Sequence, residues 1–294
     1  MTKTAWVFPG QGSQSIGMGA DLLELESAQA MFRQAEAILG WSVPEVCQSQ
    51  DDKVSNTLYT QPCLYVIESI LVNVMSDRHQ SPAIVAGHSL GEYVALYAAK
   101  VFDFEIGLRL VQSRALLMSQ DSQGMMAALI GFDRDQLDTL IAETEGVVLA
   151  NDNNASQAVI SGTNEAVQSV MNQIKAKRKI PLNVSGAFHS PLVADAAKEF
   201  SVVIDTIEFQ DAQIPVLPNV EPVPTTQADT LKRCLNQQMT GSVRWRETSL
   251  RLAEEGIEHV VEIGPGNVLT GLIKRTCPSV TLQNVRSLAD LPDA

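Results

Sequence analysis

Short apolar runs alternate along the chain with segments of helical periodicity. Three of the runs, at 5–8, 83–87 and 259–263, each lead into a turn that contains glycine. A short continuous apolar run that ends in turn residues is typical of a buried strand. The segment 92–99, which follows the second run, has helical character. Strands that alternate with helices in this way predict a parallel α/β sheet.

Residues 124–188 show a different pattern, with strands and helices in the order βαββαβ. Asp133 precedes the first helical segment and is suited to cap it, because its carboxylate can accept hydrogen bonds from the free N–H groups of the first turn. Asp152, Asn153 and Asn154 favour a turn between the second and third strands. The expected elements are strands at 125–131, 147–151, 157–161 and 180–185 and helices at 133–143 and 164–177. This order is that of a ferredoxin-like unit.

The two patterns together predict an α/β protein with two parts. We expect a large, hydrolase-like domain with a parallel sheet, formed by residues 1–123 and 189–294. A smaller ferredoxin-like subdomain is expected over residues 124–188. The Pro-rich stretch 215–224 is expected to be an irregular connection.

Composition and charge exclude several classes of function. With 45% hydrophobic and 19% charged residues, the chain is typical of a globular protein. Its net charge of −13 argues against nucleic acid binding, which needs a basic surface. The N-terminal apolar run ends at Pro9, too early for a signal peptide, and no stretch approaches the roughly 18 apolar residues of a membrane helix. We therefore expect a cytoplasmic protein that does not bind membranes.

The four cysteines stand far apart in the sequence, and no two of them form a C-x-x-C pair. Such pairs supply the ligands of many zinc sites and the thiols of redox motifs. The expected state is therefore free thiols, without a bound metal.

The second apolar run leads into a candidate nucleophile, Ser89. The sequence Gly87-His88-Ser89-Leu90-Gly91 matches the G-x-S-x-G nucleophile elbow, and it has the strand before it and the helix after it that the elbow requires. The glycines permit a cramped turn that exposes the serine, and the first N–H groups of the helix can bind an anion there. The alternative is a tight turn with an incidental serine.

A serine hydroxyl needs a base, and the chain has four histidines. His79 lies in a polar segment and His259 begins an expected strand, while His88 is a neighbour of Ser89 that could shape the pocket. His189 follows an expected strand and precedes a helix, so it is the best candidate for the base. The alternative is that His189 caps the helix that follows it.

Arg114 stands in an apolar helical pattern after the elbow. An arginine at such a position is either a surface residue or a cation that points inward. The helical pattern by itself favours the surface position, because arginine side chains are mostly exposed.

These residues belong to sequence blocks that resemble the malonyl-CoA–acyl carrier protein transacylases of fatty acid synthesis and the related acyltransferase domains of polyketide synthases. The resemblance covers nearly the whole chain, and several blocks in the same order are more specific than any one block. The blocks are Phe8-Pro-Gly-Gln-Gly-Ser-Gln14, Thr60-Gln-Pro62, Gly87-His-Ser-Leu-Gly-Glu-Tyr93, Arg114, Gly186-Ala-Phe-His-Ser-Pro191, Val243-Arg-Trp245 and Glu262-Ile-Gly-Pro-Gly-Asn-Val-Leu-Thr270.

The resemblance implies a role for each matching residue. Ser89 would be the nucleophile and His189 its base. The main-chain N–H groups of Gln11 and Leu90 would form the oxyanion hole. The family lacks the usual acidic third partner, and its histidine is oriented by an amide group. Gln238 matches that position by its spacing to the block at 243–245.

The resemblance also implies how the acyl group is recognised. Arg114 would pair with the free carboxylate of malonate, for which guanidinium offers two parallel hydrogen bonds. In the polyketide relatives, a phenylalanine just before the histidine accompanies malonyl preference, because its ring would crowd an α-methyl branch. Phe188 matches that residue, whereas Gly186 stands where those relatives often have histidine. His88 is expected to contribute to the pocket wall.

The substrates implied are malonyl-CoA and an acyl carrier protein, with no bound cofactor. Because carrier proteins of this pathway are acidic, docking would need a basic patch. The candidates are Lys175, Lys177, Arg178 and Lys179 at the end of the second helix of the small subdomain, and Lys274 with Arg275. The alternative is that these cations simply favour a helix C-terminus.

The resulting hypothesis is a monomeric enzyme that moves malonyl from coenzyme A to the carrier protein through an ester on Ser89. One alternative is a serine hydrolase or thioesterase that shares the elbow and the base. A second is a catalytically idle scaffold that binds carrier protein. The pathway served could be fatty acid elongation or polyketide synthesis.

Overall fold

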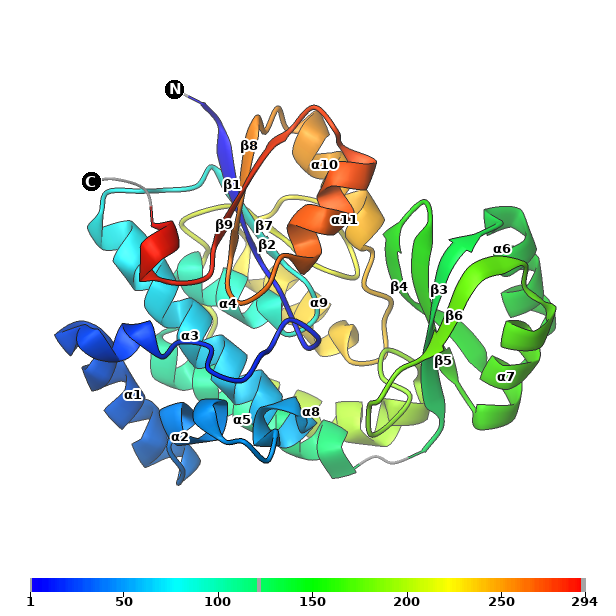
Figure 1. The fold of residues 1–294 in the computed structure, drawn as a ribbon, viewed down its shortest axis with the longest axis horizontal. Helices are drawn as coiled ribbons and strands as arrows, with labels where there is room; N and C mark the ends of the chain where they lie inside the picture. Colours follow the sequence, from blue (N-terminus) through cyan, green and yellow to red (C-terminus); the bar gives the residue numbers. More distant parts are fainter. Residues whose placement is uncertain (1, 121–122, 292–294) are drawn as a thin grey trace.

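The computed structural model describes residues 2–120 and 123–291. Figure 1 shows a larger part formed by both ends of the sequence, and a smaller part, in green, formed by its middle. The elements of the larger part are β1 (Thr4–Phe8), η1 (Asp21–Glu24), α1 (Glu26–Leu39), α2 (Val43–Gln48), η2 (Lys53–Ser55), α3 (Thr57–Asp77), β2 (Ile84–Gly87), α4 (Gly91–Ala98), α5 (Phe104–Gln120), η3 (Pro191–Val193), α8 (Ala194–Asp205), β7 (Val216–Leu217), α9 (Ala228–Gln238), α10 (Trp245–Glu254), β8 (His259–Ile263), α11 (Val268–Thr276), β9 (Thr281–Val285) and η4 (Leu288–Asp290). Those of the smaller part are β3 (Met125–Phe132), α6 (Arg134–Glu143), β4 (Val147–Asn154), β5 (Gln157–Gly162), α7 (Asn164–Gln173) and β6 (Ala176–Pro181).

The larger part contains a five-stranded sheet in the order β7-β2-β1-β8-β9, in which every neighbouring pair is parallel. The strands predicted at 5–8, 83–87 and 259–263 are β1, β2 and β8, and they occupy the centre of the sheet. Phe8 pairs with Gly87, so β1 and β2 end at the same level. Functional sites of such sheets gather at the carboxyl ends of the strands, and the loops that follow β1 and β2 therefore meet there.

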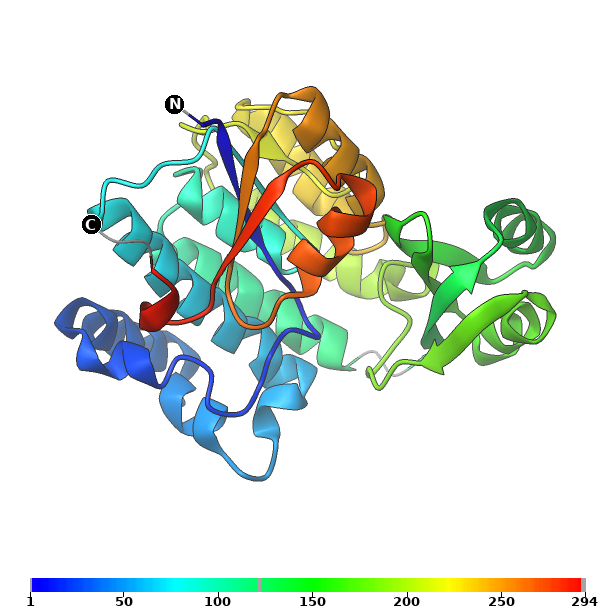
Figure 2. The same ribbon diagram turned by 45° about the horizontal axis from the view of Figure 1, so that its top comes forward.

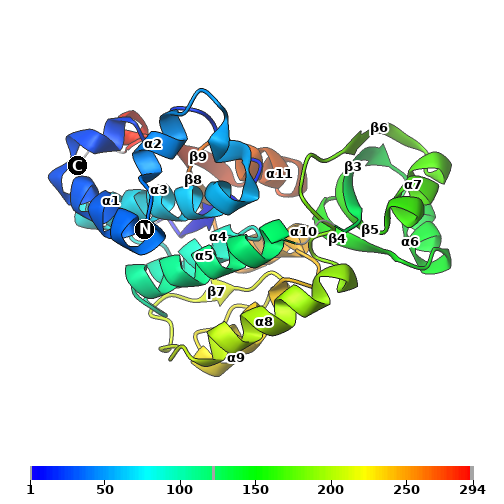
Figure 3. The same cartoon turned by 90° about the horizontal axis from the view of Figure 1, so that it is seen from below.

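Helices cover both faces of the parallel sheet because successive side chains of a strand point to opposite faces. In β1, Ala5 and Val7 pack into a cluster with residues of α10 and α11, whereas Trp6 and Phe8 join the cluster that contains α3, α4 and α5. Figure 3 shows α5 running between α3 and α8 beneath the sheet.

The smaller part is a four-stranded antiparallel sheet in the order β4-β5-β3-β6. The succession βαββαβ and this strand order confirm the predicted ferredoxin-like fold. Asp133 caps α6 as expected, because its side chain accepts a hydrogen bond from the N–H of Gln136. In Figures 1 and 2 the two helices α6 and α7 lie on the side of the small sheet that faces away from the larger part.

Two predictions within the small part are wrong. α7 ends at Gln173 instead of continuing to 177, because Ile174 adopts extended geometry (ψ 134°) and buries its side chain. The last strand lies at Ala176–Pro181 instead of 180–185, where it pairs with β3 at the edge of the sheet. Lysine and arginine are good helix formers, but here the pairing of the strand outweighs that local preference.

The turn expected at Asp152, Asn153 and Asn154 is also absent, because β4 continues through these residues. The register between β4 and β5 shifts twice in this region, as in β-bulges. Here β4 contacts the larger part. The N–H of Asp152 donates to the carbonyl of Val243 (3.0 Å), and the carboxylate of Asp152 pairs with Arg246 of α10 (2.9 Å).

The Pro-rich stretch is irregular apart from the two residues of β7. The domain boundaries at 123/124 and 188/189 stay predictions, and residues 1, 121–122 and 292–294 lie outside the described ranges.

Candidate active site

Ser89 stands at the sharp turn between β2 and α4, with a φ of 50° in the left-handed region. Side chains other than glycine rarely adopt this conformation, and it is typical of a nucleophile elbow. The turn packs tightly against β1. A Cβ atom on Gly91 would lie 2.0 Å from the carbonyl oxygen of Phe8, so this position requires glycine. The structure thus places the serine as the motif predicts.

The loop after β1 lies directly against the elbow. A Cβ atom on Gly10 would lie 2.4 Å from the carbonyl oxygen of His88, so glycine is needed for this close approach. The approach brings Gln11 beside Ser89, and both line the same pocket. In the described part of the chain, the main-chain N–H groups of Gln11 and Leu90 donate no hydrogen bond. Both groups are therefore available to a ligand oxygen, as an oxyanion hole requires.

His189 reaches Ser89 from the loop that precedes η3. Its Nε2 lies 2.8 Å from the Ser89 Oγ, and its Nδ1 lies 2.9 Å from the main-chain oxygen of Gln238 and 3.1 Å from that of Gly241. Two carbonyl acceptors at Nδ1 place the proton there, which leaves Nε2 free to accept the serine proton. This is the arrangement that a general base needs.

The surroundings of His189 keep its imidazole neutral. Burial, together with the positive charge of Arg114, lowers the pKa of His189 to about 3. Removal from water disfavours the charged form, and a nearby cation adds to that effect. His189 is therefore deprotonated at neutral pH and competent to accept a proton.

Gln238 contacts His189 through its main-chain oxygen and not through its side-chain amide. The side chain lies elsewhere: its Oε1 accepts from the Arg114 Nη2 (3.1 Å), and its Nε2 donates to the carbonyl oxygen of Ser89 (2.8 Å) and to the Glu92 Oε2 (2.7 Å). The reason is geometric. Gln238 is the last residue of α9, where main-chain carbonyls lack helical partners and can accept from His189.

Arg114 points inward from α5, and only 1% of it is exposed. Of the two alternatives for Arg114, a surface residue or a cation that points inward, the second is therefore correct. Nη1 donates to the Gln61 Oε1 (2.7 Å), and Nη2 donates to the Ser89 Oγ (2.9 Å). The guanidinium carbon lies 5.5 Å from the centre of the Tyr93 ring. A buried cation thus contacts the Ser89 hydroxyl directly.

Two residues of the elbow's support were missed in the sequence. Asn219, in the irregular stretch, accepts a hydrogen bond from the Ser89 N–H (2.7 Å) and donates to the carbonyl of Gly87 (2.6 Å). Glu92 is a fully buried carboxylate in α4. An ionisable residue inside the apolar helix 91–98 was a signal for Glu92, whereas no local signal marks Asn219.

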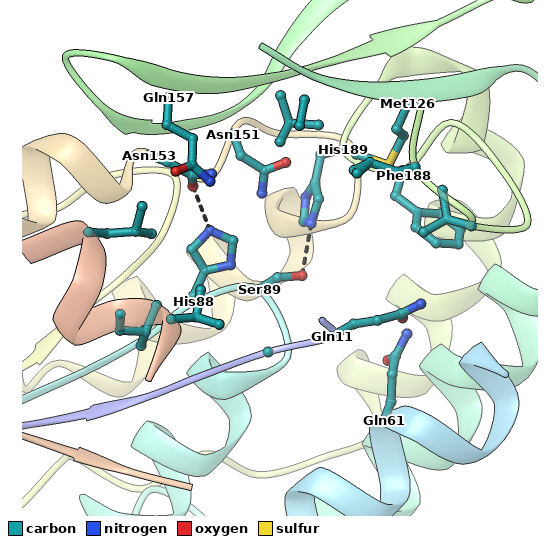
Figure 4. A pocket seen from close by; sticks show the side chains of 18 of the residues that line it. Gln11, Gln61, His88, Ser89, Met126, Asn151, Asn153, Gln157, Phe188 and His189 are labelled. Atoms are coloured by element: carbon teal, nitrogen blue, oxygen red, sulfur yellow. Dashed lines mark hydrogen bonds between the residues drawn. The ribbon is translucent and has the colours of Figure 1, made fainter. Parts of the chain in front are cut away.

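A pocket of about 230 Å³ opens over these groups. Figure 4 shows Ser89, His189 and Gln11 facing its interior, with Phe188 along one wall. His88 forms part of the wall as expected, and its Nε2 lies 3.0 Å from the Asn153 Oδ1. Apolar side chains complete the lining: Met118, Met126, Ala128, Val159, Leu182, Val184, Val268, Leu269 and Leu272.

The structure does not bring the six basic docking candidates together. Lys177 and Arg178 are neighbours on the edge strand β6, so their side chains point to opposite faces, and neither belongs to a helix end. Lys274 and Arg275 are exposed in the last turn of α11, the helix whose first residues line the pocket. Of the six candidates, only Lys274 and Arg275 therefore lie at a helix C-terminus, where basic residues are favoured without any docking role.

Within the described ranges, no helix is both long and apolar enough to span a bilayer. No cluster of three or more His, Cys, Asp or Glu side chains in those ranges could hold a metal ion.

Comparison with known proteins agrees with this geometry. The family model described as "Acyl transferase domain" matches residues 5–292. A malonyl CoA-acyl carrier protein transacylase from Synechocystis sp. is 54% identical over 289 residues, which cover 98% of this chain and 99% of that protein.

Solved structures give the same relationship. The crystal structure of the Synechocystis malonyl-CoA:ACP transacylase superimposes with a TM-score of 0.97 and 54% identity over 98% of both chains. A malonyl-transacylase in complex with its type II PKS acyl-carrier protein superimposes with a TM-score of 0.93 and 36% identity, over 98% of this chain and 97% of that one. The resemblance stated from the sequence is confirmed: the chain belongs to the acyl transferase family, among the malonyl CoA-acyl carrier protein transacylases.

Proposed function

We propose that the protein transfers a malonyl group from malonyl-CoA to the phosphopantetheine thiol of an acyl carrier protein, for fatty acid elongation in the cytoplasm. The observation that carries the proposal is the buried Arg114 guanidinium, which lies 2.9 Å from the nucleophilic Ser89 Oγ. A buried cation needs an anionic partner, and the carboxylate of a malonyl group on Ser89 supplies one at this place. An enzyme for neutral acyl groups has no use for such a charge.

The first half-reaction forms the ester. His189 Nε2 takes the hydroxyl proton while the Ser89 Oγ attacks the thioester carbonyl, and the carbonyl electrons move to its oxygen. The N–H groups of Gln11 and Leu90 are the proposed donors to this oxyanion. The intermediate then collapses, the carbon–sulfur bond breaks, and the imidazolium returns the proton to the coenzyme A thiolate.

The second half-reaction reverses these steps with a different thiol. The pantetheine thiol gives its proton to His189 and attacks the malonyl ester, and the Ser89 oxygen leaves with that proton. Throughout, Arg114 holds the malonyl carboxylate, and the ring of Phe188 limits the room beside the α-carbon. Coenzyme A thioesters enter as substrates, and the proposed mechanism uses the chain's own side chains for every proton transfer.

The proposal is tested by following the acyl group after loading. When the protein is mixed with malonyl-CoA and a holo carrier protein, we expect malonyl-carrier protein to form much faster than free malonate. Intact-mass spectrometry of the carrier and quantification of free malonate measure the two rates. Faster release of malonate than of malonyl-carrier protein would favour the hydrolase instead.

We further propose that Lys274 and Arg275 contribute to carrier docking, because α11 carries them at one end and borders the pocket at the other. Reversing both charges to glutamate should raise the KM for the acidic carrier on the order of tenfold, since charges at an interface rim act mainly on association. Malonyl loading from coenzyme A should keep its wild-type rate.

The matched comparison reverses Lys177 and Arg178 on the edge strand β6. Their side chains point to opposite faces, so at most one of the two can meet a single partner surface. A larger rise in the carrier KM from this pair than from the α11 pair would indicate that the carrier docks on the small sheet and not on α11. An unchanged KM for both pairs would remove the docking claim.

A further inference from the structure

Three groups that the proposed reaction uses are tied to one buried carboxylate. Glu92 is the second residue of α4, and only 1% of it is exposed. Its Oε2 accepts two hydrogen bonds, from the main-chain N–H of Asn219 (3.2 Å) and from the Gln238 Nε2 (2.7 Å). These two donors lead to different parts of the active site.

The branch through Asn219 leads to the nucleophile. The Asn219 side chain accepts from the Ser89 N–H and donates to the carbonyl of Gly87, so it spans the strained turn on both sides of His88. Glu92 holds the main chain of Asn219, and this contact fixes where the Asn219 amide can reach. The position of Ser89 therefore depends on Glu92 through one intervening residue.

The branch through Gln238 leads to the arginine and the base. The Gln238 Oε1 accepts from Arg114, and the Gln238 main-chain oxygen accepts from the His189 Nδ1. An amide offers an acceptor on one side and a donor on the other. With a carboxylate at its Nε2 and a guanidinium at its Oε1, the Gln238 side chain has one satisfying orientation.

Charge strengthens the same arrangement. Among the described residues, the oxygens that accept hydrogen bonds from Arg114 belong to neutral groups, a serine and two glutamines. Glu92 places a negative charge one amide group away from this buried cation. Hydrogen bonds to an ionised acceptor are roughly twice as strong as those between neutral groups.

From these contacts we infer that Glu92 is a positioning residue. Through Asn219 and Gln238 it fixes the positions of the nucleophile, the base and the arginine relative to one another. The inference rests on the proposed malonyl transfer and adds to it a residue that never touches the substrate. Because Arg114 depends on the Gln238 amide, Glu92 also contributes to the preference for an acyl group with a carboxylate.

The protonation state of Glu92 provides a measurable signature. Burial raises the pKa of Glu92 to about 7, although hydrogen bonds from Gln238 and Asn219 and the charge of Arg114 lower it. The other titratable groups that interact with it are Tyr93 and Cys234, whose pKa values burial raises. The ionised carboxylate accepts the two N–H donors more strongly than the neutral acid does and so holds Asn219 and Gln238 more firmly, and loading should therefore fall as the pH decreases through about 7. His189, with a pKa of about 3, does not titrate in this window.

The test compares Glu92→Gln with Glu68→Gln, which makes the same change at another buried carboxyl, on α3. Single-turnover loading is followed by intact-mass spectrometry with malonyl-CoA and with acetyl-CoA. For Glu92→Gln we expect malonyl loading to fall by about ten- to a hundredfold, because small displacements of reacting groups have effects of that size. Acetyl loading should fall less, since it does not use Arg114. Glu68→Gln should keep the malonyl-to-acetyl ratio of the wild type.

The pH profile separates positioning from simple destabilisation. Between about pH 5.5 and 8.5, the malonyl loading rate of the wild type should fall toward acidic pH, which gives an acidic limb in the profile. The profile of Glu92→Gln should lack this limb. Glu92→Asp, which keeps the charge on a shorter side chain, should retain a limb and recover part of the ratio, and it replaces the first variant if that one does not fold. Equal losses for both acyl groups with an unchanged limb would overturn the inference. A wild type that loads no malonyl would instead overturn the proposed function.

Discussion

The Ser89→Ala protein is expected to carry no malonyl group after mixing with malonyl-CoA. The ester needs the serine oxygen, which lies 2.8 Å from the His189 Nε2, the proposed acceptor of its proton. Loss of a nucleophile removes the covalent route, so we expect transfer to the carrier to fall on the order of 10⁴-fold or more. Intact-mass spectrometry measures the label, and a coupled assay with holo carrier protein measures the rate.

The replacement should leave the fold unchanged. Ser89 has a φ of 50°, and alanine meets the same steric cost there because both residues carry a Cβ atom. Ser69→Ala is the matched control, since Ser69 is another buried serine, on α3, away from the pocket. It should load malonyl as the wild type does. Malonyl label at the wild-type level on the Ser89→Ala protein would refute the assignment of the nucleophile.

The elbow was predictable from local sequence because its requirements are local. A strand must end, a turn must pass through the left-handed region, and a helix must begin, all within five residues of 87–91. Gly91 fits because a side chain there would collide with β1. The same reasoning holds for the ferredoxin-like part, whose strand order follows from the succession of its elements.

The network behind the elbow was not predictable in this way, because its contacts join distant residues. The hydrogen bond between Ser89 and Asn219 spans 130 positions, and that between Gln238 and Ser89 spans 149. Local periodicity contains no information about such pairs. Gln238 was found through the family resemblance, but the contact it makes with His189 depends on where α9 ends.

Helical propensity misled the prediction near residue 175. The segment 175–179 contains four basic residues, which suit a helix, and it continues the periodicity of α7. The segment forms a strand instead, because pairing with β6 satisfies the main-chain groups at the free edge of β3.

For Arg114, the helical pattern alone favoured a surface position, and the family resemblance corrected this preference. The spacing of the buried residues around Arg114 explains why it points inward. Leu110 and Met118, four positions before and after it, are both buried on the same helix face.

The Arg114→Ala protein is expected to lose malonyl transfer selectively. Removing one partner of a desolvated, hydrogen-bonded charge pair costs about 2–5 kcal/mol, so malonyl transfer should fall about thirtyfold or more. Acetyl transfer should fall little or rise. A smaller acyl group without a carboxylate gains nothing from a buried cation, and loss of that cation also removes one cause of the lowered His189 pKa.

Two comparisons isolate the role of the guanidinium. Arg114→Lys keeps a charge without the planar pair of donors, so it should recover part of the malonyl rate and keep the pKa of His189 low. Arg109→Ala removes an exposed arginine of the same helix, whose partner is Glu105, and should leave both acyl groups unaffected. Steady-state rates with malonyl-CoA and acetyl-CoA give the ratio for each variant. Equal losses of malonyl and acetyl transfer in Arg114→Ala would show that the arginine supports the fold of the site, and the carboxylate of the substrate would then have another partner.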